Sequence, residues 1–319
     1  MIRSLNISPN FSDNHLDACG ICPHVCKVHR SIGQTGFCGA GAGSGVVSIC
    51  VHHGEEPCLS GESGICNVFF GNCNLRCTYC QNIQISAPPL NGGMPELSFE
   101  EVVKRIGACL DQGCTAVGFV SPSHQVPQMK HIISLLNDCG RFPVIVYNSN
   151  GYDKLETLQS LEGLVDVYLP DFKYADDALA KTFSGVTHYV QTATAAIKEM
   201  IRQKGRKLIT NDMELAVSGI LIRHLVLPGY IENSIGVLNI IAEAFSPGMW
   251  VSLMAQYHPM PAVETVPGLN RSLSSAEYNR VLRHMEDLGI SNGYIQELES
   301  NDCYLPDFNE FHPFEIKLT

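Results

Sequence analysis

Short apolar runs alternate with segments of helical periodicity from residue 66 onward. Apolar runs without polar alternation are typical of strands that are buried on both faces of a parallel sheet. Their alternation with helical patterns predicts repeated βα units. The predicted strands are 66–70, 116–120, 144–147, 165–169, 220–227 and 250–255.

The intervals between these strands carry helix signals. Ser98 and Glu101 have the spacing of a capping box at a helix start, and Gly113 follows as a stop signal. Ser274 and Glu277 form a second pair of this kind. The predicted helices are 98–113, 126–139, 153–161, 175–203, 231–244 and 274–288.

Six parallel strands with helices outside them predict an α/β fold, either an open doubly wound sheet or an incomplete barrel. In both architectures the functional residues gather at the carboxyl ends of the strands. The segment 1–62 differs, because it is rich in Gly, Cys and His and has little periodicity. We therefore expect a Cys-rich, loop-rich module over 1–62 and the βα domain, with a C-terminal extension, over 63–319.

Composition narrows the class of protein. No apolar run is long enough to span a membrane, and the first residues lack the continuous apolar stretch of a signal peptide. We therefore expect a cytoplasmic protein with no membrane partner. A net charge of −11 disfavours nucleic acid as a partner, because binding to phosphates needs clustered Lys and Arg.

The chain has 14 cysteines, and ten of them precede residue 81. In a cytosolic chain of this length they indicate metal or redox chemistry rather than a disulfide framework. The sequence GNCNLRCTYCQN, just after the first predicted strand, places Cys73, Cys77 and Cys80 on one loop. Three thiolates at this spacing can hold three corners of an iron-sulfur cube and leave one iron open, which is typical of a catalytic site. The alternatives are buried core thiols or a zinc site that a remote residue completes.

CNLRCTYC resembles the CxxxCxxC motif of radical S-adenosylmethionine (SAM) enzymes, including the aromatic Tyr79 before the third cysteine. Gln81 and Asn82 resemble the His-Asn pair after this motif in glycyl-radical-enzyme activases such as pyruvate formate-lyase activating enzyme. The Cys-rich start and the EEPC sequence at 55–58 resemble uncharacterised homologues of that activase. The resemblance implies a [4Fe-4S] cluster, SAM as cofactor and a partial (βα)6 TIM-type barrel.

The family holds SAM against the strand ends, and the resemblance implies which residues do so here. After the second strand, Ser123 and His124 stand where the family has a Gly-Gly-Glu segment that takes the amino group of SAM. Asn148 and Ser149, after the third strand, would lie near the SAM carboxylate. The other implied SAM contacts are Tyr79, Asn82, Asp171, Lys173, Val226 and His258.

Asp171 and Lys173 follow the fourth strand in an Asp-x-Lys pattern that resembles the activase. Asp171 would reach ribose or a cation, and Lys173 would neutralise the SAM carboxylate. A structural ion pair at a strand end is the alternative. The segment that contains Val226 would face adenine through its backbone, and His258 would approach the adenosyl group.

The resemblance implies that SAM is reductively cleaved to methionine and a 5′-deoxyadenosyl radical, which abstracts a hydrogen atom from a substrate. Flavodoxin or ferredoxin would be the reductant, under anaerobic conditions. Three functions remain open: activation of a glycyl-radical enzyme, modification of a small metabolite or of a peptide or protein side chain, and a non-catalytic iron-sulfur or zinc role. His124 and Arg223 would be selective contacts in the second function, although Arg223 is equally well interpreted as a buried ion-pair partner. The His and Glu residues within 52–56 are interpreted as a solvated turn rather than a metal site.

Cys19, Cys22, Cys26 and Cys38 form a second set, which we call the N-terminal cysteine group, in CGICPHVCKVHRSIGQTGFCG. Zinc sites usually pair cysteines on two opposing knuckles, whereas three cysteines on one loop with a remote fourth are closer to the ligation of an iron cube. We therefore expect an auxiliary [4Fe-4S] cluster. Structural zinc is the second interpretation and unligated thiols are the third.

Overall fold

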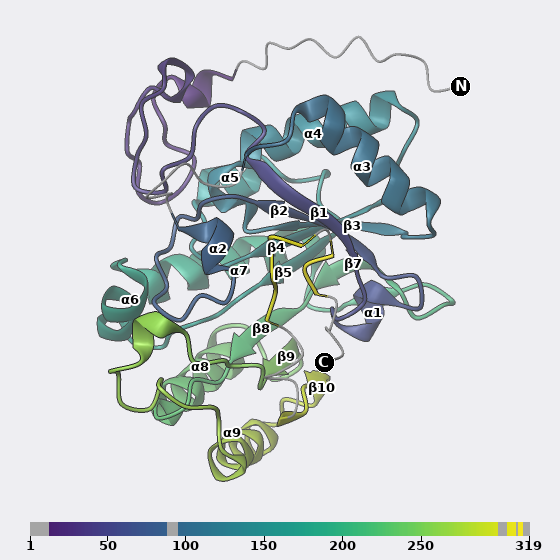
Figure 1. Cartoon of the computed structure of the whole chain (residues 1–319). Helices are drawn as coiled ribbons and strands as arrows, with labels where there is room; N and C mark the ends of the chain where they lie inside the picture. Colours follow the sequence, from purple (N-terminus) through teal and green to yellow (C-terminus); the bar gives the residue numbers. More distant parts are fainter. Residues whose placement is uncertain (1–12, 88–94, 299–304, 311, 315–319) are drawn as a thin grey trace.

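The computed structural model describes residues 13–87, 95–298, 305–310 and 312–314. Most of its strands and helices alternate along the chain, and the long helices lie outside the strands (Figure 1). Among the described helices, none combines the length and the apolar character that spanning a membrane requires.

The larger sheet has seven strands. Strands β2 to β5 and β7 run parallel, whereas β1 and β6 are antiparallel to their neighbours β2 and β7. In spatial order the sheet contains β1 (Val46–His52), β2 (Ile65–Phe70), β3 (Ala116–Val120), β4 (Val144–Ser149), β5 (Val167–Pro170), β7 (Ala216–Ile220) and β6 (Ile209–Thr210).

A smaller sheet of three parallel strands continues the larger one. Only Leu221 separates β7 from β8, and a parallel bridge between Asp171 and Arg223 joins the two sheets. The strands therefore curve as one incomplete barrel, which confirms the predicted fold class. The smaller sheet contains, in spatial order, β8 (Ile222–Leu225), β9 (Trp250–Met254) and β10 (Asn292–Ile295).

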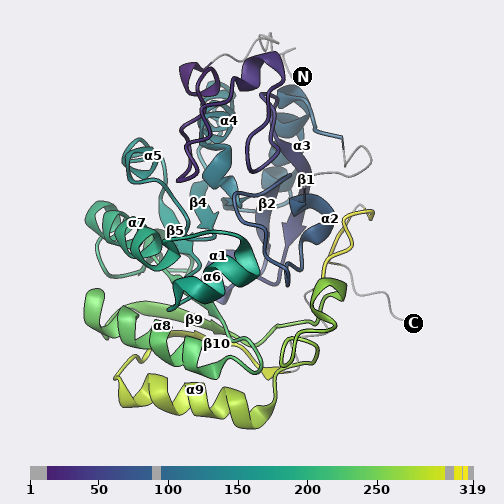
Figure 2. The ribbon, with the colours of Figure 1, turned by 90° about the vertical axis from the view of Figure 1, so that its left-hand side faces the viewer.

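Helices cover the outer face of the strands, with α3 and α4 on one side and α8 and α9 on the other (Figure 2). Short 3-10 turns lie at Asn14–Leu16, Arg30–Ile32, Pro122–His124 and Pro261–Val263. The α-helices are α1 (Pro57–Ser60), α2 (Ile83–Ser86), α3 (Phe99–Asp111), α4 (Val126–Asp138), α5 (Leu155–Gln159), α6 (Asp177–Ser184), α7 (Tyr189–Lys204), α8 (Ile231–Ala244) and α9 (Ser275–Asp287).

Two helix starts show the local chemistry that the sequence predicts. The hydroxyl of Ser98 accepts the backbone N–H of Glu101 at the start of α3. The carboxylate of Glu101 pairs with Arg105 at 2.7 Å instead of completing the predicted box. Ser274 and Glu277 form the complete box before α9. Short-range capping therefore sets where both helices begin.

Some predicted elements have different bounds. The predicted helix 175–203 is two helices, because the chain adopts a left-handed conformation at Gly185 (φ 70°) after α6 and at His188 (φ 57°) before α7. The predicted strand 220–227 is divided between β7 and β8. Strands β1, β6 and β10 were not among the predicted strands. Strand β1 lies within 1–62 and pairs with β2, so this segment contributes a strand to the larger sheet.

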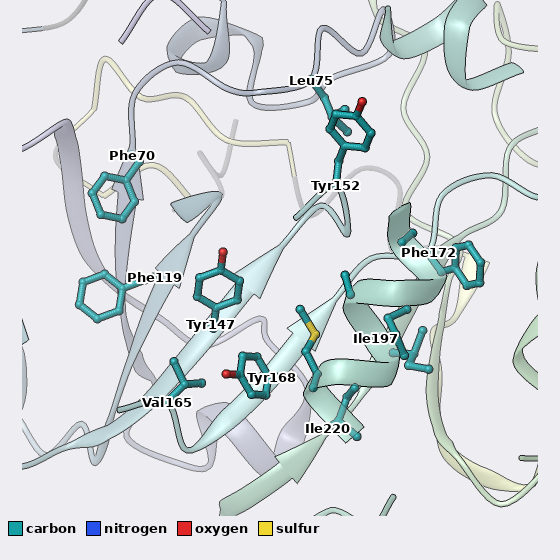
Figure 3. Packing of buried hydrophobic residues seen from close by; sticks show 14 of the residues in the cluster. Phe70, Leu75, Phe119, Tyr147, Tyr152, Val165, Tyr168, Phe172, Ile197 and Ile220 are labelled. Atoms are coloured by element: carbon teal, nitrogen blue, oxygen red, sulfur yellow. The ribbon is translucent and has the colours of Figure 1, made fainter. Parts of the chain in front are cut away.

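Both faces of the parallel strands are buried, which explains their continuous apolar runs. Phe119 and Tyr147 pack into the large cluster that includes the inner faces of the helices. Their strand neighbours Ala116 and Val146 belong to a smaller cluster on the opposite face. Phe70 and Phe119 stack with 6.1 Å between ring centroids (Figure 3). This packing fixes the strand ends, where the polar residues lie.

Candidate active site

The loop 71–82, which we call the cavity loop, carries three cysteines at the carboxyl end of β2. It leaves the strand through Asn72, whose φ of 65° lies in the left-handed region that Asn tolerates. Two backbone bonds then fix it to the end of α6: the N–H of Arg76 donates to the carbonyl of Ser184 at 3.0 Å, and that of Thr78 donates to the carbonyl of Phe183 at 2.8 Å. The loop is therefore held between β2 and α6.

Cys73 accepts two hydrogen bonds. The backbone N–H of Leu75 and the side-chain amide of Asn150 each donate to its Sγ at 3.4 Å. Asn150 is buried, and its Nδ2 also donates to Oδ1 of Asn74 at 2.8 Å. Because Asn150 directly follows β4, it connects the first cysteine to a second strand end.

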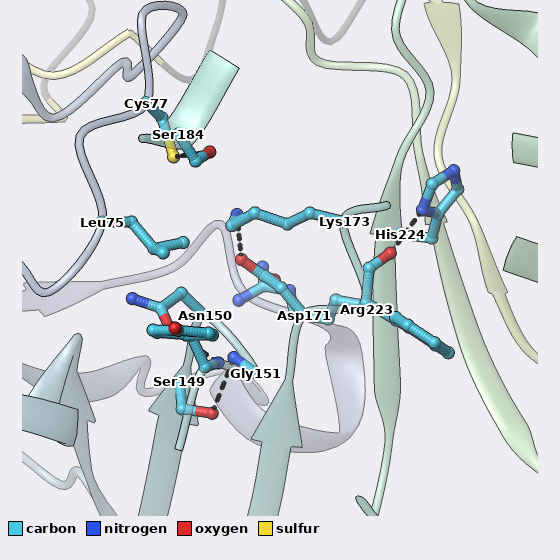
Figure 4. A network of polar contacts seen from close by, with 12 residues as sticks. Leu75, Cys77, Ser149, Asn150, Gly151, Asp171, Lys173, Ser184, Arg223 and His224 are labelled. Atoms are coloured by element: carbon cyan, nitrogen blue, oxygen red, sulfur yellow. Dashed lines mark hydrogen bonds and ion pairs between the residues drawn. The ribbon is translucent and has the colours of Figure 1, made fainter. Parts of the chain in front are cut away.

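The other two thiols each meet a serine hydroxyl. Sγ of Cys77 lies 2.9 Å from Oγ of Ser184, and Sγ of Cys80 lies 3.2 Å from Oγ of Ser86. Figure 4 shows the first of these contacts above Lys173. The partners of the three sulfurs come from the end of β4, from α6 and from α2. Hydrogen bonds to ligand sulfurs are one of the means by which proteins set the potential of an iron-sulfur cluster.

Burial raises the pKa of the Cys73 thiol to about 12. Burial also raises the pKa of Cys77, to about 11, although Lys173 acts in the opposite direction. Both thiols are therefore neutral at pH 7 without metal, and a metal displaces their protons when it binds. Among the described residues, no three His, Cys, Asp or Glu side chains converge closely enough for a single ion. The corners of a cube hold their ligands further apart than one ion does.

A cavity opens beside these thiols, at the carboxyl ends of the strands. Its space, open mouth included, is about 1140 Å³. The cavity loop and the ends of β3, β4, β5, β8 and β9 supply its walls. The predicted residues that line it are Cys73, Cys77, Tyr79, Cys80, Asn82, Asn148, Ser149, Asp171 and Lys173.

Lys173 and Asp171 form an ion pair in this cavity (Figure 4). Nζ lies 2.5 Å from Oδ2, and the side chains are 18% and 20% exposed. Burial alone would lower the pKa of Lys173, but Asp171 and Cys77 outweigh it, so the pKa is raised above its usual value. The ammonium group therefore stays charged and stabilises a thiolate at Cys77.

Arg223 is a buried ion-pair partner. It lies 3.0 Å from Glu55 and 3.1 Å from Glu56, and none of the three side chains is more than 13% exposed. This segment is therefore not the predicted solvated turn, because β8 places a guanidinium group against it. Burial acts to raise the pKa of both carboxyls. At Glu55 the contacts with Arg223, His52 and Asn67 outweigh burial and the pKa is lowered, whereas at Glu56 burial prevails and the pKa is raised.

Four predicted SAM contacts are absent from the described residues that line the cavity: Ser123, His124, Val226 and His258. His124 is buried, and its Nε2 donates to the carbonyl of Gly71 at 3.0 Å. Burial, and to a lesser extent Arg30, lowers the pKa of His124 to about 4, so the ring is neutral. The structure thus places His124 where it fixes the start of the cavity loop.

Other lining residues were not predicted as SAM contacts. Ser121 ends β3 with a φ of 56°, an uncommon conformation for serine that turns the chain at the cavity wall. The side-chain amide of Gln81 donates to the carbonyl of Gln256 at 2.7 Å, and both residues line the cavity. Leu225 lines it in place of its neighbour Val226, because side chains alternate along β8. The alternation of side chains along the predicted strand could therefore have identified Leu225.

The N-terminal cysteine group lies outside the cavity, in the loops before β1 (Figure 1). Three of its thiols are buried and that of Cys26 is half-buried. All cysteines of the described residues are free thiols. This agrees with the expectation that the cysteines do not form a disulfide framework.

Comparison with known proteins identifies the family. The sequence profile of the Radical SAM superfamily matches residues 67–233, which is just over half of the chain. The chain therefore belongs to the radical SAM superfamily. A relative from Methanocaldococcus jannaschii, described as an uncharacterised protein, is 28% identical over 291 residues, which cover 90% of this chain and 79% of that protein.

Solved structures show the shared fold. A radical SAM methyltransferase from Sphaerobacter thermophilus superposes with a TM-score of 0.52 at 14% identity, over 73% of this chain and 66% of that one. This chain thus spans just under two thirds of that structure, and the likeness concerns the fold alone. A domain of a pyruvate-formate lyase-activating enzyme from Bacteroides vulgatus matches with a TM-score of 0.39 at 15% identity, over 54% of this chain and 93% of the domain. That score is too low to carry an argument.

Membership of this family implies a [4Fe-4S] cluster and SAM. The residues present fit both groups. Cys73, Cys77 and Cys80 lie on the wall of one cavity, and each sulfur has a hydrogen-bonding partner. The same cavity contains a charged ammonium group, amides and hydroxyls, which are the donors that an amino acid carboxylate and a ribose need.

Proposed function

We propose that this protein reductively cleaves SAM to methionine and a 5′-deoxyadenosyl radical, and that the radical abstracts a hydrogen atom from a second bound molecule. The observation that carries the proposal is the position of Cys73, Cys77 and Cys80 on the wall of a cavity at the strand ends. Cys73, Cys77 and Cys80 would hold the cluster, which would supply the electron for SAM cleavage after reduction by an external donor. Family membership supports the same chemistry.

A chain of hydroxyl groups supports the charge at Cys77. Tyr79 OH lies 2.6 Å from Tyr174 OH, which lies 2.6 Å from Oγ of Ser184, and Ser184 in turn contacts Cys77. When Cys77 is a thiolate, Ser184 must donate to the sulfur. Tyr174 then donates to Ser184, and Tyr79 donates to Tyr174. All three hydroxyl dipoles therefore point toward the sulfur and stabilise its negative charge.

Polar residues at the ends of β4 and β5 are proposed to bind the methionine part of SAM. Lys173 offers an ammonium group to the carboxylate, and Asn148 and Ser149 offer an amide and a hydroxyl. Asp171 remains beside Lys173 and accepts hydrogen bonds from ribose. Leu225, at the end of β8, presents an apolar surface on which adenine can lie. These residues would hold SAM in the cavity that the three cysteines line.

A second cavity adjoins the first and is the proposed place of the substrate. The two share Glu55, Arg223 and Gln256, and the second extends to Tyr294 and Gln296 at the end of β10. A substrate there would lie beside the adenosyl group. The buried segment that contains Glu55 forms a wall that the two cavities share.

The charge around the second cavity favours one class of substrate. Two buried carboxylates, Glu55 and Glu56, face a single guanidinium group on Arg223. One guanidinium group therefore faces two carboxyls, and burial raises the pKa of Glu56. This arrangement favours a small molecule or a peptide side chain with an ammonium or guanidinium group. Activation of a glycyl-radical enzyme, supported by the motif resemblance, is the alternative.

The proposal is tested by anaerobic incubation of the reconstituted protein with SAM and dithionite, followed by mass analysis of 5′-deoxyadenosine and methionine. The wild-type protein should release both. Cys77→Ala should reduce release to the level without protein, because two thiolates do not hold the cube. Cys139→Ala changes an exposed cysteine and is the matched control. Normal SAM cleavage by Cys77→Ala would contradict the assignment.

The same reaction distinguishes the substrate classes. Candidate amines, and candidate peptides that contain Lys or Arg, are supplied with deuterium on carbon. Transfer of deuterium into 5′-deoxyadenosine identifies the molecule that is attacked. Transfer from a glycyl-radical enzyme, with none from the amines or peptides, would replace the favoured class by the activase alternative.

A further inference from the structure

The N-terminal cysteine group lies in a segment with almost no regular structure. Between η1 (Asn14–Leu16) and β1, the described chain forms only the short 3-10 turn Arg30–Ile32. Yet Cys19, Cys22 and Cys38 are each at most 7% exposed. Cys19 packs in the large hydrophobic cluster, whereas Cys22 and Cys38 belong to none of the apolar clusters of the described residues, so apolar packing does not account for their burial.

The backbone brings the cysteines of the group together, because the N–H of Lys27, next to Cys26, donates to the carbonyl of Cys19 at 2.8 Å. Two backbone N–H groups point at sulfurs. The N–H of Phe37 lies 3.4 Å from Sγ of Cys26, and the N–H of Ala40 lies 3.5 Å from Sγ of Cys38. Such donors stabilise sulfurs that carry negative charge.

The backbone at Gly36 also approaches the sulfur of Cys26 closely. A Cβ atom on Gly36 would lie 2.7 Å from Sγ of Cys26, so only glycine at this position avoids a clash with the sulfur. Gly36 precedes Phe37, whose N–H donates to the same sulfur. The turn therefore wraps the sulfur closely, as a loop does around a ligand atom of a bound centre.

Arg30 supplies an independent observation. Its side chain is 2% exposed, and its guanidinium group bonds to the carbonyls of Gly41 and His124 and to Oε1 of Gln125. Within the part of the chain that the structure describes, no carboxylate pairs with it. A buried guanidinium group without a counter-charge is costly. Arg30 bonds to Gly41, the neighbour of Ala40, whose N–H lies 3.5 Å from Sγ of Cys38. Thiolates in this group would therefore provide the missing negative charge.

We infer that Cys19, Cys22, Cys26 and Cys38 together bind a second [4Fe-4S] cluster, closed by four protein thiolates. Thiolates on a cube give a centre of net negative charge, which pairs with Arg30. The spacing of three cysteines on one loop and a remote fourth suits a cube. Among the described residues the thiols do not converge to the distances of one ion, and the same is true of Cys73, Cys77 and Cys80, where we propose the first cube.

The second cluster would lie against the cavity loop. Nε2 of His24 lies 2.9 Å from the carbonyl of Asn74, the residue after Cys73. Nη2 of Arg76, the residue before Cys77, donates to the carbonyl of Phe37 at 2.7 Å, and its guanidinium group lies 4.3 Å from the centre of the Phe37 ring. Neighbours of cysteines thus join the two loops directly. The second cluster would therefore hold the cavity loop in place without binding SAM.

The test is metal counting on the full-length triple variant Cys73→Ala/Cys77→Ala/Cys80→Ala after anaerobic reconstitution with iron and sulfide. About four irons per chain should remain, because a cube contains four. One zinc without iron would overturn the inference, and so would a folded variant without metal. Circular dichroism and gel filtration establish that the variant is folded.

A second measurement keeps the inference testable when the triple variant does not fold. The wild-type protein should then bind about eight irons per chain, and Cys139→Ala, which changes an exposed cysteine, should bind the same number. About four irons in the wild type would contradict a second cluster. This count is independent of SAM cleavage, so either proposal can fail while the other stands.

Discussion

The cavity loop and the N-terminal cysteine group are built alike but have different surroundings. In both, buried or half-buried sulfurs are close to hydrogen-bond donors, and neither is part of a helix or strand. The cavity loop has three cysteines and borders a cavity with a charged Lys173. The N-terminal group has four cysteines and lies outside that cavity.

This difference shows what separates a reactive centre from a supporting one. A centre that binds a small molecule needs one position free of protein ligands and polar groups arranged around it. The cavity loop meets both conditions through its missing fourth cysteine and through the ends of β4 and β5. The N-terminal group has a full set of thiols and a buried Arg30 instead. On these proposals the same residue type serves two functions, because the strand ends surround only one group.

Lys173→Met should have the largest effect on what sets the cavity loop apart, which is its proposed binding of SAM. Loss of a charge-assisted contact with the SAM carboxylate costs about 1.5–3 kcal/mol, so SAM affinity should fall roughly 10- to 100-fold. Equilibrium binding of SAM to the reconstituted protein measures it, with iron content checked to be unchanged. Lys181→Met, on the exposed face of α6, is the control. Unchanged affinity in Lys173→Met would mean that the ion pair with Asp171 is only structural.

A smaller effect is expected from Asn150→Ala. The variant removes one hydrogen bond to Cys73, which accepts negative charge when the cluster is reduced. If this hydrogen bond contributes a net of about 0.5–1 kcal/mol, its loss lowers the reduction potential of the cluster by roughly 20–40 mV. A redox titration without SAM measures this shift. Asn148→Ala changes another lining residue and should leave the potential unchanged. Equal potentials in wild type and Asn150→Ala would show that the amide does not tune the cluster.

Much of the cavity could be predicted from the sequence, because its residues follow strands that are recognisable as apolar runs. The predicted strand at 144–147 places Asn148 and Ser149 directly at its end, and Asp171 and Lys173 follow the next strand in the same way. A residue just after a parallel strand lies at the carboxyl edge of the sheet whatever the rest of the chain does. Local pattern was therefore sufficient for these positions.

Contacts between residues far apart in the chain could not be predicted from the sequence. The contact of Arg223 with Glu55 and Glu56 depends on how β8 lies against the segment before α1, and no local signal encodes it. His124 follows β3 as the motif suggests, but a 3-10 turn at Pro122–His124 directs its ring to the carbonyl of Gly71. The break between α6 and α7 depends on Gly185, which a helical period over 175–203 conceals.

The cysteines of the cavity loop are proposed to hold the centre that binds SAM. Electron paramagnetic resonance of the dithionite-reduced wild-type protein, recorded with and without SAM labelled with ¹⁷O in its carboxylate, examines whether they do. SAM should change one component of the spectrum, this component should show coupling to ¹⁷O, and Cys77→Ala should lack it. A spectrum that SAM leaves unchanged, or a coupled component that persists in Cys77→Ala, would show that SAM does not bind at a centre held by these cysteines.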